Sequence, residues 1–181
     1  KVLGSGRNIH EAAKGNKTFY FEAGKPYNIE IEFIQNKSEY AHIQLMWNVP
    51  GKNLKKEALD LAKKSDLVVL CMGLSPSLEG EEMNVNIDGF YKGDRTDIKL
   101  PQVQTELMQE IVKLGKPTVL VLLNGSALAV NWENENIPAI LNVWFGGTEA
   151  GNAVADAVYG PANGGINPSG KLTVTFPQNL G

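Results

Sequence analysis

The chain has 181 residues, of which 43% are hydrophobic and 20% charged, and its formal net charge is -3. This composition is typical of a globular protein with one domain, or one domain and part of another. No basic cluster indicates a nucleic-acid partner, no apolar run approaches the roughly 20 residues of a membrane span, and the single cysteine, Cys71, excludes an internal disulfide.

The first 50 residues are dominated by alternating apolar and polar positions. Strands are predicted at residues 18–21, 27–33 and 42–47, and Pro50-Gly51 ends the segment. Alternation with a period of two is typical of antiparallel strands that have one solvent-exposed face. The N-terminal part is therefore expected to be a short antiparallel β segment.

After residue 51 the pattern changes to apolar runs that alternate with amphipathic stretches. Because apolar strands separated by helices indicate a mostly parallel sheet covered on both faces, the fold class predicted here is α/β, a three-layer α/β/α sandwich. Cys71 lies inside the first apolar run and is expected to be buried. Helices are predicted at residues 54–64, 102–114 and 150–159, and strands at 67–72, 118–123, 138–144 and 171–176.

The first buried strand leads into an acidic loop of about 28 residues, from Gly73 to Leu100. Glu79, Glu81 and Glu82 fall within four positions of this loop. Open α/β sheets bind ligands at the carboxyl ends of their strands, and neighbouring carboxylates raise one another's pKa toward the range that a general acid needs. A solvated acidic loop is the simpler interpretation of the same composition.

Several other patterns do not carry chemistry. The segment 165–172 begins like a phosphate loop, but Leu172 replaces the required Ser or Thr and a strand rather than a helix is predicted to follow. No Gly-x-Ser-x-Gly motif is present, and His10 and His42 stand apart from any metal-ligand spacing. We therefore expect no cofactor and no metal, although several acidic oxygens of the loop could converge on a divalent cation.

Taken together, the phrases after residue 53 resemble the C-terminal α/β sandwich of glycoside hydrolase family 3, and the likeness covers residues 53–181. Residues 1–50 are similar to the end of a protective-antigen-type β-sandwich, a module inserted in some family members and implicated in sugar recognition. The phrases that carry the family resemblance are Ser65–Leu70, the acidic loop, Gly93–Pro101, Val119–Gly125, Trp144–Gly151 and Asn167–Leu172.

The resemblance implies a retaining, exo-acting β-glycosidase, which uses a nucleophile and an acid/base carboxyl roughly 5–5.5 Å apart. The family's nucleophile is an aspartate in a separate N-terminal barrel, whose Ser-Asp-Trp phrase is absent from this chain. The acid/base is expected on the acidic loop, with Glu81 favoured, Glu79 second and Glu82 third. Asp94 and Arg95 are expected to support the loop where it returns.

The resemblance also indicates the partners and the compartment. They are an oligosaccharide or β-glycoside substrate and the missing barrel of the same parent chain, and the parent is expected to be periplasmic or secreted. The Glu-x-Glu spacing favours β-xylosides, with β-glucosides left open. The abrupt ends, Lys1 and Gly181, suggest an excised piece that is inactive alone. The alternative hypothesis is a non-catalytic carbohydrate-binding module.

Overall fold

The computed structural model describes residues 17–33, 43, 45–46, 51–76, 78, 85–160 and 164–181. The chain divides into two compact units, residues 1–51 and residues 52–181. Each unit is described by itself.

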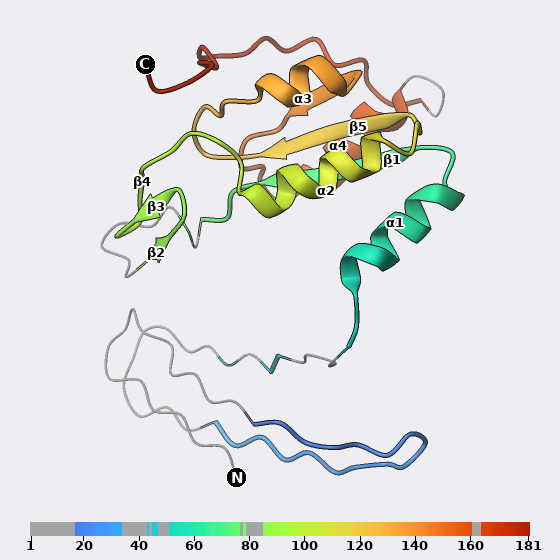
Figure 1. Cartoon of the computed structure of the whole chain (residues 1–181). Coiled ribbons are helices and arrows are strands. Elements are labelled where there is room, and N and C mark those ends of the chain that lie inside the picture. Colours follow the sequence, from blue (N-terminus) through green and yellow to red (C-terminus); the bar gives the residue numbers. More distant parts are fainter. Residues whose placement is uncertain are drawn as a thin grey trace. The chain divides into compact units, whose positions relative to one another are not determined.

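In the first unit, residues 17–33 form two extended stretches on either side of a turn at Ala23-Gly24 (Figure 1). The N–H of Lys25 donates to the carbonyl of Glu22 at 3.2 Å and closes this turn. The predicted strands at 18–21 and 27–33 are not formed, because no ladder joins the two stretches within residues 17–33. Their side chains are exposed, and a lone pair of strands without a packed face is marginal in water.

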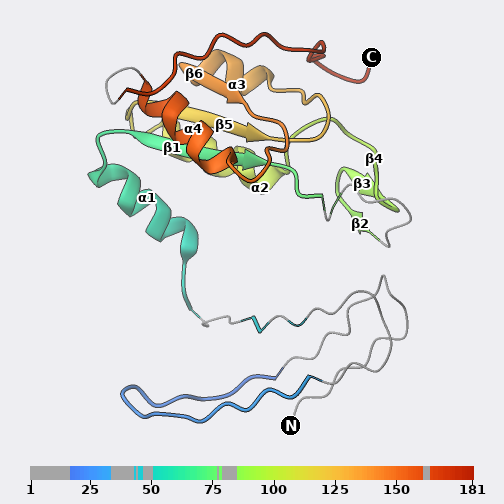
Figure 2. The same cartoon turned by 180° about the vertical axis from the view of Figure 1, so that it is seen from behind.

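The second unit contains a parallel sheet with strand order β1-β5-β6. The three strands are in register, so that Leu70 of β1 lies beside Leu120 of β5, which lies beside Ile140 of β6. Helix α2 lies on one face of the sheet and α4 on the other (Figures 1 and 2). The elements are α1 (Leu54–Lys64), β1 (Val68–Gly73), α2 (Gln102–Val112), β5 (Thr118–Leu123), α3 (Asn131–Asn136), β6 (Ala139–Asn142) and α4 (Ala150–Tyr159).

Local sequence signals explain where the helices begin and end. The side chain of Asn53 accepts a hydrogen bond of 2.9 Å from the backbone N–H of Lys56 and caps α1. Pro101 precedes the first residue of α2, and Gly115, with φ of 68°, follows its last turn. The predicted helices and the α/β sandwich are therefore confirmed.

The core lies between α2 and the face of the sheet that carries the even-numbered residues of β1 and β5. Met108 of α2 and Leu120 of β5 are fully buried there. The opposite face of β1 is less covered, because Val69 and Cys71 are exposed. The expectation that Cys71 is buried is wrong, since it lies on the face of β1 opposite the core, where the helix α4 has no buried residue.

The strand predicted at residues 171–176 is also not formed. This segment is extended with a bend, and Leu172 and Val174 are exposed. Phe176 is the residue of this stretch that packs inward, with its ring 5.8 Å from that of Trp144. Its alternating pattern resembles that of a strand, but no ladder pairs it with another strand in the described part of the chain.

We predict that Met108→Ala lowers the free energy of unfolding by about 2–5 kcal/mol, because it removes a fully buried side chain and leaves a cavity. Val103 provides a matched control on the same helix, since its side chain is 72% exposed. Val103→Ala should change the free energy by less than about 0.5 kcal/mol. Urea denaturation measures both, and equal losses would contradict this account of the core.

Candidate functional site

The last residue of β1 is held from both sides. Its neighbour Leu74 donates its backbone N–H to the carbonyl of Leu123 in β5 at 2.8 Å. On the side away from β5, the backbone N–H of Gly73 donates to Oε1 of Gln104 at 2.9 Å, and Nε2 of Gln104 donates to the carbonyl of Gly73 at 2.8 Å. The start of the acidic loop is therefore fixed by the sheet and by α2 together.

Gly73 is required at this position for two reasons. Its φ of 147° lies in a region that side chains rarely allow. A Cβ added here would also lie 1.8 Å from the carbonyl oxygen of Leu123, which belongs to the backbone and cannot move aside. The strand and its neighbour approach each other closely because this residue has no side chain.

No strand was predicted in the loop that follows, but it contains a small antiparallel sheet, β2-β3-β4. Phe90 of this sheet is buried and belongs to the core. Two-residue turns at Asp88-Gly89 and Lys92-Gly93 connect the strands, and Asp-Gly is a known hairpin signal. The strands are β2 (Asn86–Ile87), β3 (Phe90–Tyr91) and β4 (Asp94–Arg95).

Arg95 connects this small sheet to the loop after β5. Its Nη1 donates to Oγ of Ser126 at 2.7 Å and to the carbonyl of Ala127 at 3.1 Å, and its Nε donates to the carbonyl of Asp97 at 3.2 Å. Asp94 precedes it on β4 and is exposed. The segments that leave the carboxyl ends of β1 and β5 are thus joined by the guanidinium of Arg95.

Glu79, Glu81 and Glu82, the sequence-based candidates for the acid/base, lie outside the described residues. Leu78 before them and Val85 after them are both partly buried and pack against the core. The described part of the site therefore consists of the points at which the loop leaves the sheet and returns to it.

A polar cavity of about 430 Å³ lies among the segments that follow β1 and β5. Asp88 and Asp97 line it from the loop, and Trp132 and Glu133 line it from α3. Such a set of carboxylates beside an aromatic ring can accept hydrogen bonds from hydroxyl groups and pack against a flat apolar surface.

The two buried or half-buried carboxyls of this cavity differ in their acidity. Glu133 is only 4% exposed, and burial raises its pKa, although a hydrogen bond from its own backbone N–H acts in the opposite direction. Burial would also raise the pKa of Asp97, but hydrogen bonds from Lys99 and from the N–H of Ile98 outweigh it and hold that pKa below its usual range.

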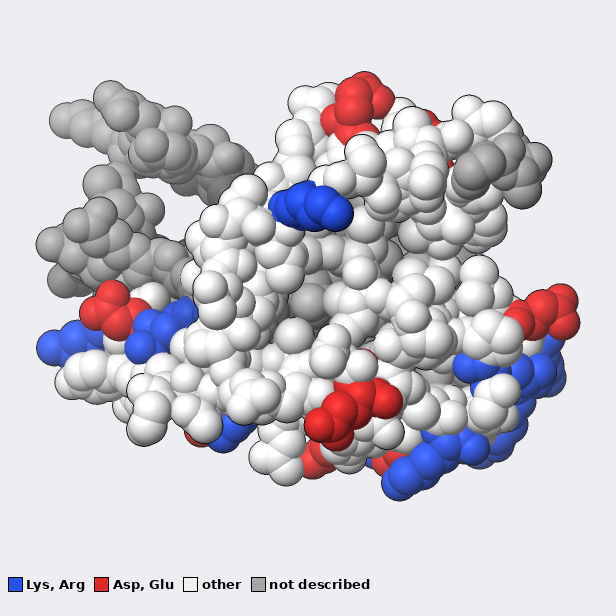
Figure 3. Space-filling view, turned by 90° about the horizontal axis from the view of Figure 1, so that it is seen from above, with Lys and Arg blue, Asp and Glu red and all other residues white. Residues whose placement is uncertain are grey.

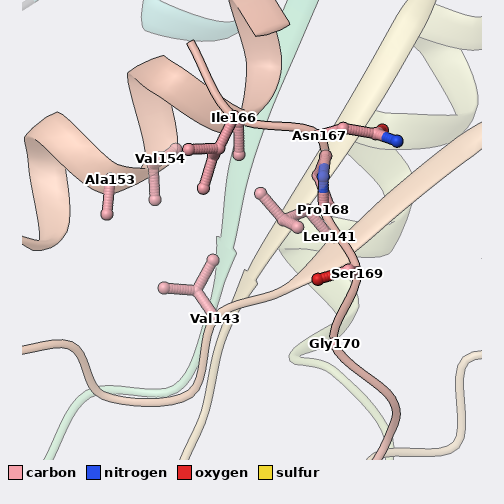
Figure 4. Close-up of a pocket in the computed structure, with 10 residues that line it drawn as sticks. Leu141, Val143, Ala153, Val154, Ile166, Asn167, Pro168, Ser169 and Gly170 are labelled. Carbon is pink, nitrogen blue, oxygen red and sulfur yellow. The ribbon is translucent and has the colours of Figure 1, made fainter.

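A second cavity, of about 590 Å³, lies on the opposite face of the sheet, between β6, α4 and the segment 166–170 (Figure 4). Its lining is mainly apolar, with Leu141, Val143 and Ile166 among the contributing side chains, and Asn167 is turned away from it. None of the described residues that line this cavity has a titratable side chain, so they offer no acid–base chemistry.

The described surface provides little for the other partner classes. On the face shown in Figure 3 most of the surface is uncharged, and the basic side chains that gather at its lower right have acidic side chains beside them. Within the described ranges, no group of three or more His, Cys, Asp or Glu side chains could hold a metal ion. None of the helices in these ranges is both long and apolar enough to cross a membrane.

The sequence model of the glycosyl hydrolase family 3 C-terminal domain matches residues 3–181. The chain belongs to this family. It is 40% identical over 158 residues to a xylan 1,4-beta-xylosidase from Xylanibacter ruminicola, covering 87% of this chain and 18% of that protein. It is 42% identical over 125 residues to a periplasmic beta-glucosidase from Salmonella typhimurium, covering 69% of this chain and 14% of that protein.

A solved structure extends this comparison to the fold of the family 3 domain. The crystal structure of a beta-glucosidase from Listeria innocua in complex with glucose matches 69% of this chain with a TM-score of 0.58 and 36% identity. The match covers 15% of that chain. The present chain thus spans less than a fifth of the length of each of these three proteins.

Two residues of this site, Gln104 and Glu133, were not identified by the sequence analysis. Gln104 lies in the first turn of a predicted helix, where a glutamine has no distinctive signal. Glu133 stands in an alternating polar stretch that gave no helix prediction, and α3 is only six residues long. The Asp88-Gly89 pair, in contrast, is a recognised two-residue hairpin turn signal.

We predict that Gly73→Ala destabilises the family 3 domain by at least about 1–3 kcal/mol, because the new Cβ would collide with the carbonyl of Leu123 and the φ would be strained. Gly147→Ala is the control, since no atom lies within 4 Å of a Cβ built there. Chemical denaturation compares the two, and equal stabilities would contradict the close approach described here.

Glu133→Gln is expected to raise the free energy of unfolding, relative to the unsubstituted protein, more at about pH 7 than at about pH 4. The folded state binds the Glu133 proton to a higher pH than the unfolded chain does, so stability falls as pH rises from the unfolded pKa through the raised one. The glutamine side chain does not ionise, so the substitution removes this loss of stability. Glu135→Gln, an exposed control on the same helix, should show no such difference between the two pH values in thermal unfolding.

Proposed function

We propose that this chain is the C-terminal α/β sandwich of a longer, retaining and exo-acting β-glycosidase. In this proposal the loop after β1 supplies the general acid/base, and an aspartate in a separate N-terminal barrel supplies the nucleophile. Family membership and the names of the relatives support the reaction class. The single observation that carries the site assignment is that the acidic loop leaves the carboxyl end of a strand in a parallel sheet.

The chemistry requires one carboxyl group to act twice. It first protonates the oxygen of the departing sugar while the nucleophile forms a glycosyl-enzyme intermediate. It then accepts a proton from the water that hydrolyses this intermediate. We assign this role to Glu81, with Glu79 as the second choice and Glu82 as the third. Arg95 supports the assignment as a loop anchor, because it joins the return of the loop to the segment after β5.

The proposed substrates are oligosaccharides and aryl glycosides with a terminal β-xylose or β-glucose. The relatives named as a xylosidase and as a glucosidase support both sugars, and the Glu-x-Glu spacing favours xylose. We further propose that the longer protein acts in the periplasm or outside the cell, since the Salmonella relative is a periplasmic beta-glucosidase. Residues 1–50 are proposed to end a protective-antigen-type module, and residues 53–181 to form the sandwich.

The test is alanine substitution of each glutamate in the full-length protein. For the true acid/base, kcat/KM on xylobiose or cellobiose should fall about 10²–10⁴-fold, since these leaving groups need a proton. Dinitrophenyl glycosides, whose leaving group needs no proton, should lose much less. Azide should restore part of the turnover, because it attacks the glycosyl-enzyme intermediate without base assistance.

Glu135→Ala removes one exposed acidic charge from α3 and is the control, so it should leave both activities unchanged. Unchanged disaccharide hydrolysis in all three of the Glu79, Glu81 and Glu82 variants would overturn the assignment.

A non-catalytic carbohydrate-binding module is the second candidate function, and the cavity lined by Trp132 and the carboxyl groups favours it. Calorimetry with xylose and glucose on this chain separates the two functions. Half of an active site should bind these sugars with millimolar or undetectable affinity and should not hydrolyse glycosides alone. Micromolar binding would favour the module.

A further inference from the structure

The side chain of Gln104 takes the place of a neighbouring strand at the end of β1. The N–H of Leu74 points toward β5, so the N–H and carbonyl of Gly73, one residue earlier, point to the opposite side of the strand. In the described part of the chain β1 pairs with β5 alone. Gln104 meets both groups of Gly73 with the donor and the acceptor of one amide, at 2.8 and 2.9 Å.

The two hydrogen bonds with Gln104 restrain the backbone of Gly73. Glycine has the greatest backbone freedom of all residues, and Gly73 cannot be replaced without a collision with Leu123. A glycine at position 73 therefore lets the end of β1 approach β5 closely, but it also makes the backbone there more flexible. The amide of Gln104 offsets this flexibility from the side opposite β5.

The direction fixed at Gly73 is the direction in which the acidic loop begins. Leu74 is buried, and Glu79 and Glu82 follow Gly73 by six and nine residues in the sequence. A general acid must come within hydrogen-bonding reach of the proton acceptor, and a displacement of about 1 Å can cost about 10²-fold in rate.

We propose that Gln104 is a positioning residue for the acid/base of this enzyme. It acts through Gly73 and contacts no substrate. The inference rests on the proposed function of the loop. A positioning role predicts that loss of the amide weakens proton transfer more than it weakens binding or nucleophilic attack.

Gln109 supplies a matched control five residues later on the same helix, and it is absent from the lining of the cavity beside α3. Gln104→Leu and Gln109→Leu therefore make the same chemical change on α2, but only the first removes the two hydrogen bonds to Gly73.

The experiment measures kcat/KM for both variants of the full-length protein on xylobiose or cellobiose and on the corresponding dinitrophenyl glycoside. For Gln104→Leu we expect a fall of about 10- to 100-fold on the disaccharide and of about threefold or less on the activated glycoside. Gln109→Leu should match the wild type on both substrates. Because both substrates report on the same folded molecules, a partial loss of stability cannot produce this difference.

An equal loss on the two substrates, or no loss, would overturn the positioning role. If Gln104→Leu does not fold, Gln104→Glu keeps the oxygen that accepts from Gly73 and removes the donor, and the same comparison applies. The Glu79, Glu81 and Glu82 variants are assayed in parallel. If none of them shows the leaving-group difference, the proposed function fails; if one does and Gln104→Leu does not, the positioning inference alone fails.

Discussion

The close approach of β1 and β5 at Gly73 is the constraint on which the described site depends. The parallel register brings Gly73 opposite Leu123, and the absence of a side chain lets the N–H of Leu74 reach the Leu123 carbonyl. The loop therefore starts from the carboxyl edge of the sheet, where α/β folds place their ligands. Arg95 holds the other end of the loop against the segment after β5. The two ends of the loop are therefore both positioned by β1, β5 and the segment that follows β5.

The two faces of the sheet are covered to different extents, and the two cavities differ in the kinds of side chain that line them. One face packs against α2 through Met108 and forms the core, while on the other face Cys71 is exposed and α4 has no buried residue. The polar cavity lies among the segments that follow β1 and β5, and the apolar one lies beside α4. Carboxyl groups whose pKa is shifted by burial or by hydrogen bonds occur in the first of these, at Glu133 and Asp97.

The sequence predicted the elements whose formation depends on local signals. The helices at 54–64 and 150–159 have the predicted bounds, because apolar spacing and flanking residues define them. The strand predicted at 171–176 failed because alternation says nothing about whether a partner strand is available. Two-residue strands such as β3 are too short for any period to appear, and the pairing of Gln104 with Gly73 spans 31 positions that no local pattern connects.

Helix α2 has two tasks, separated by one helical turn. Met108 fills the core, and Gln104, four residues earlier, reaches the end of β1. A substitution that shifts this helix in the core also shifts the amide that holds the strand end. The stability of the core and the position of the first loop residues therefore change together, because one helix contacts both.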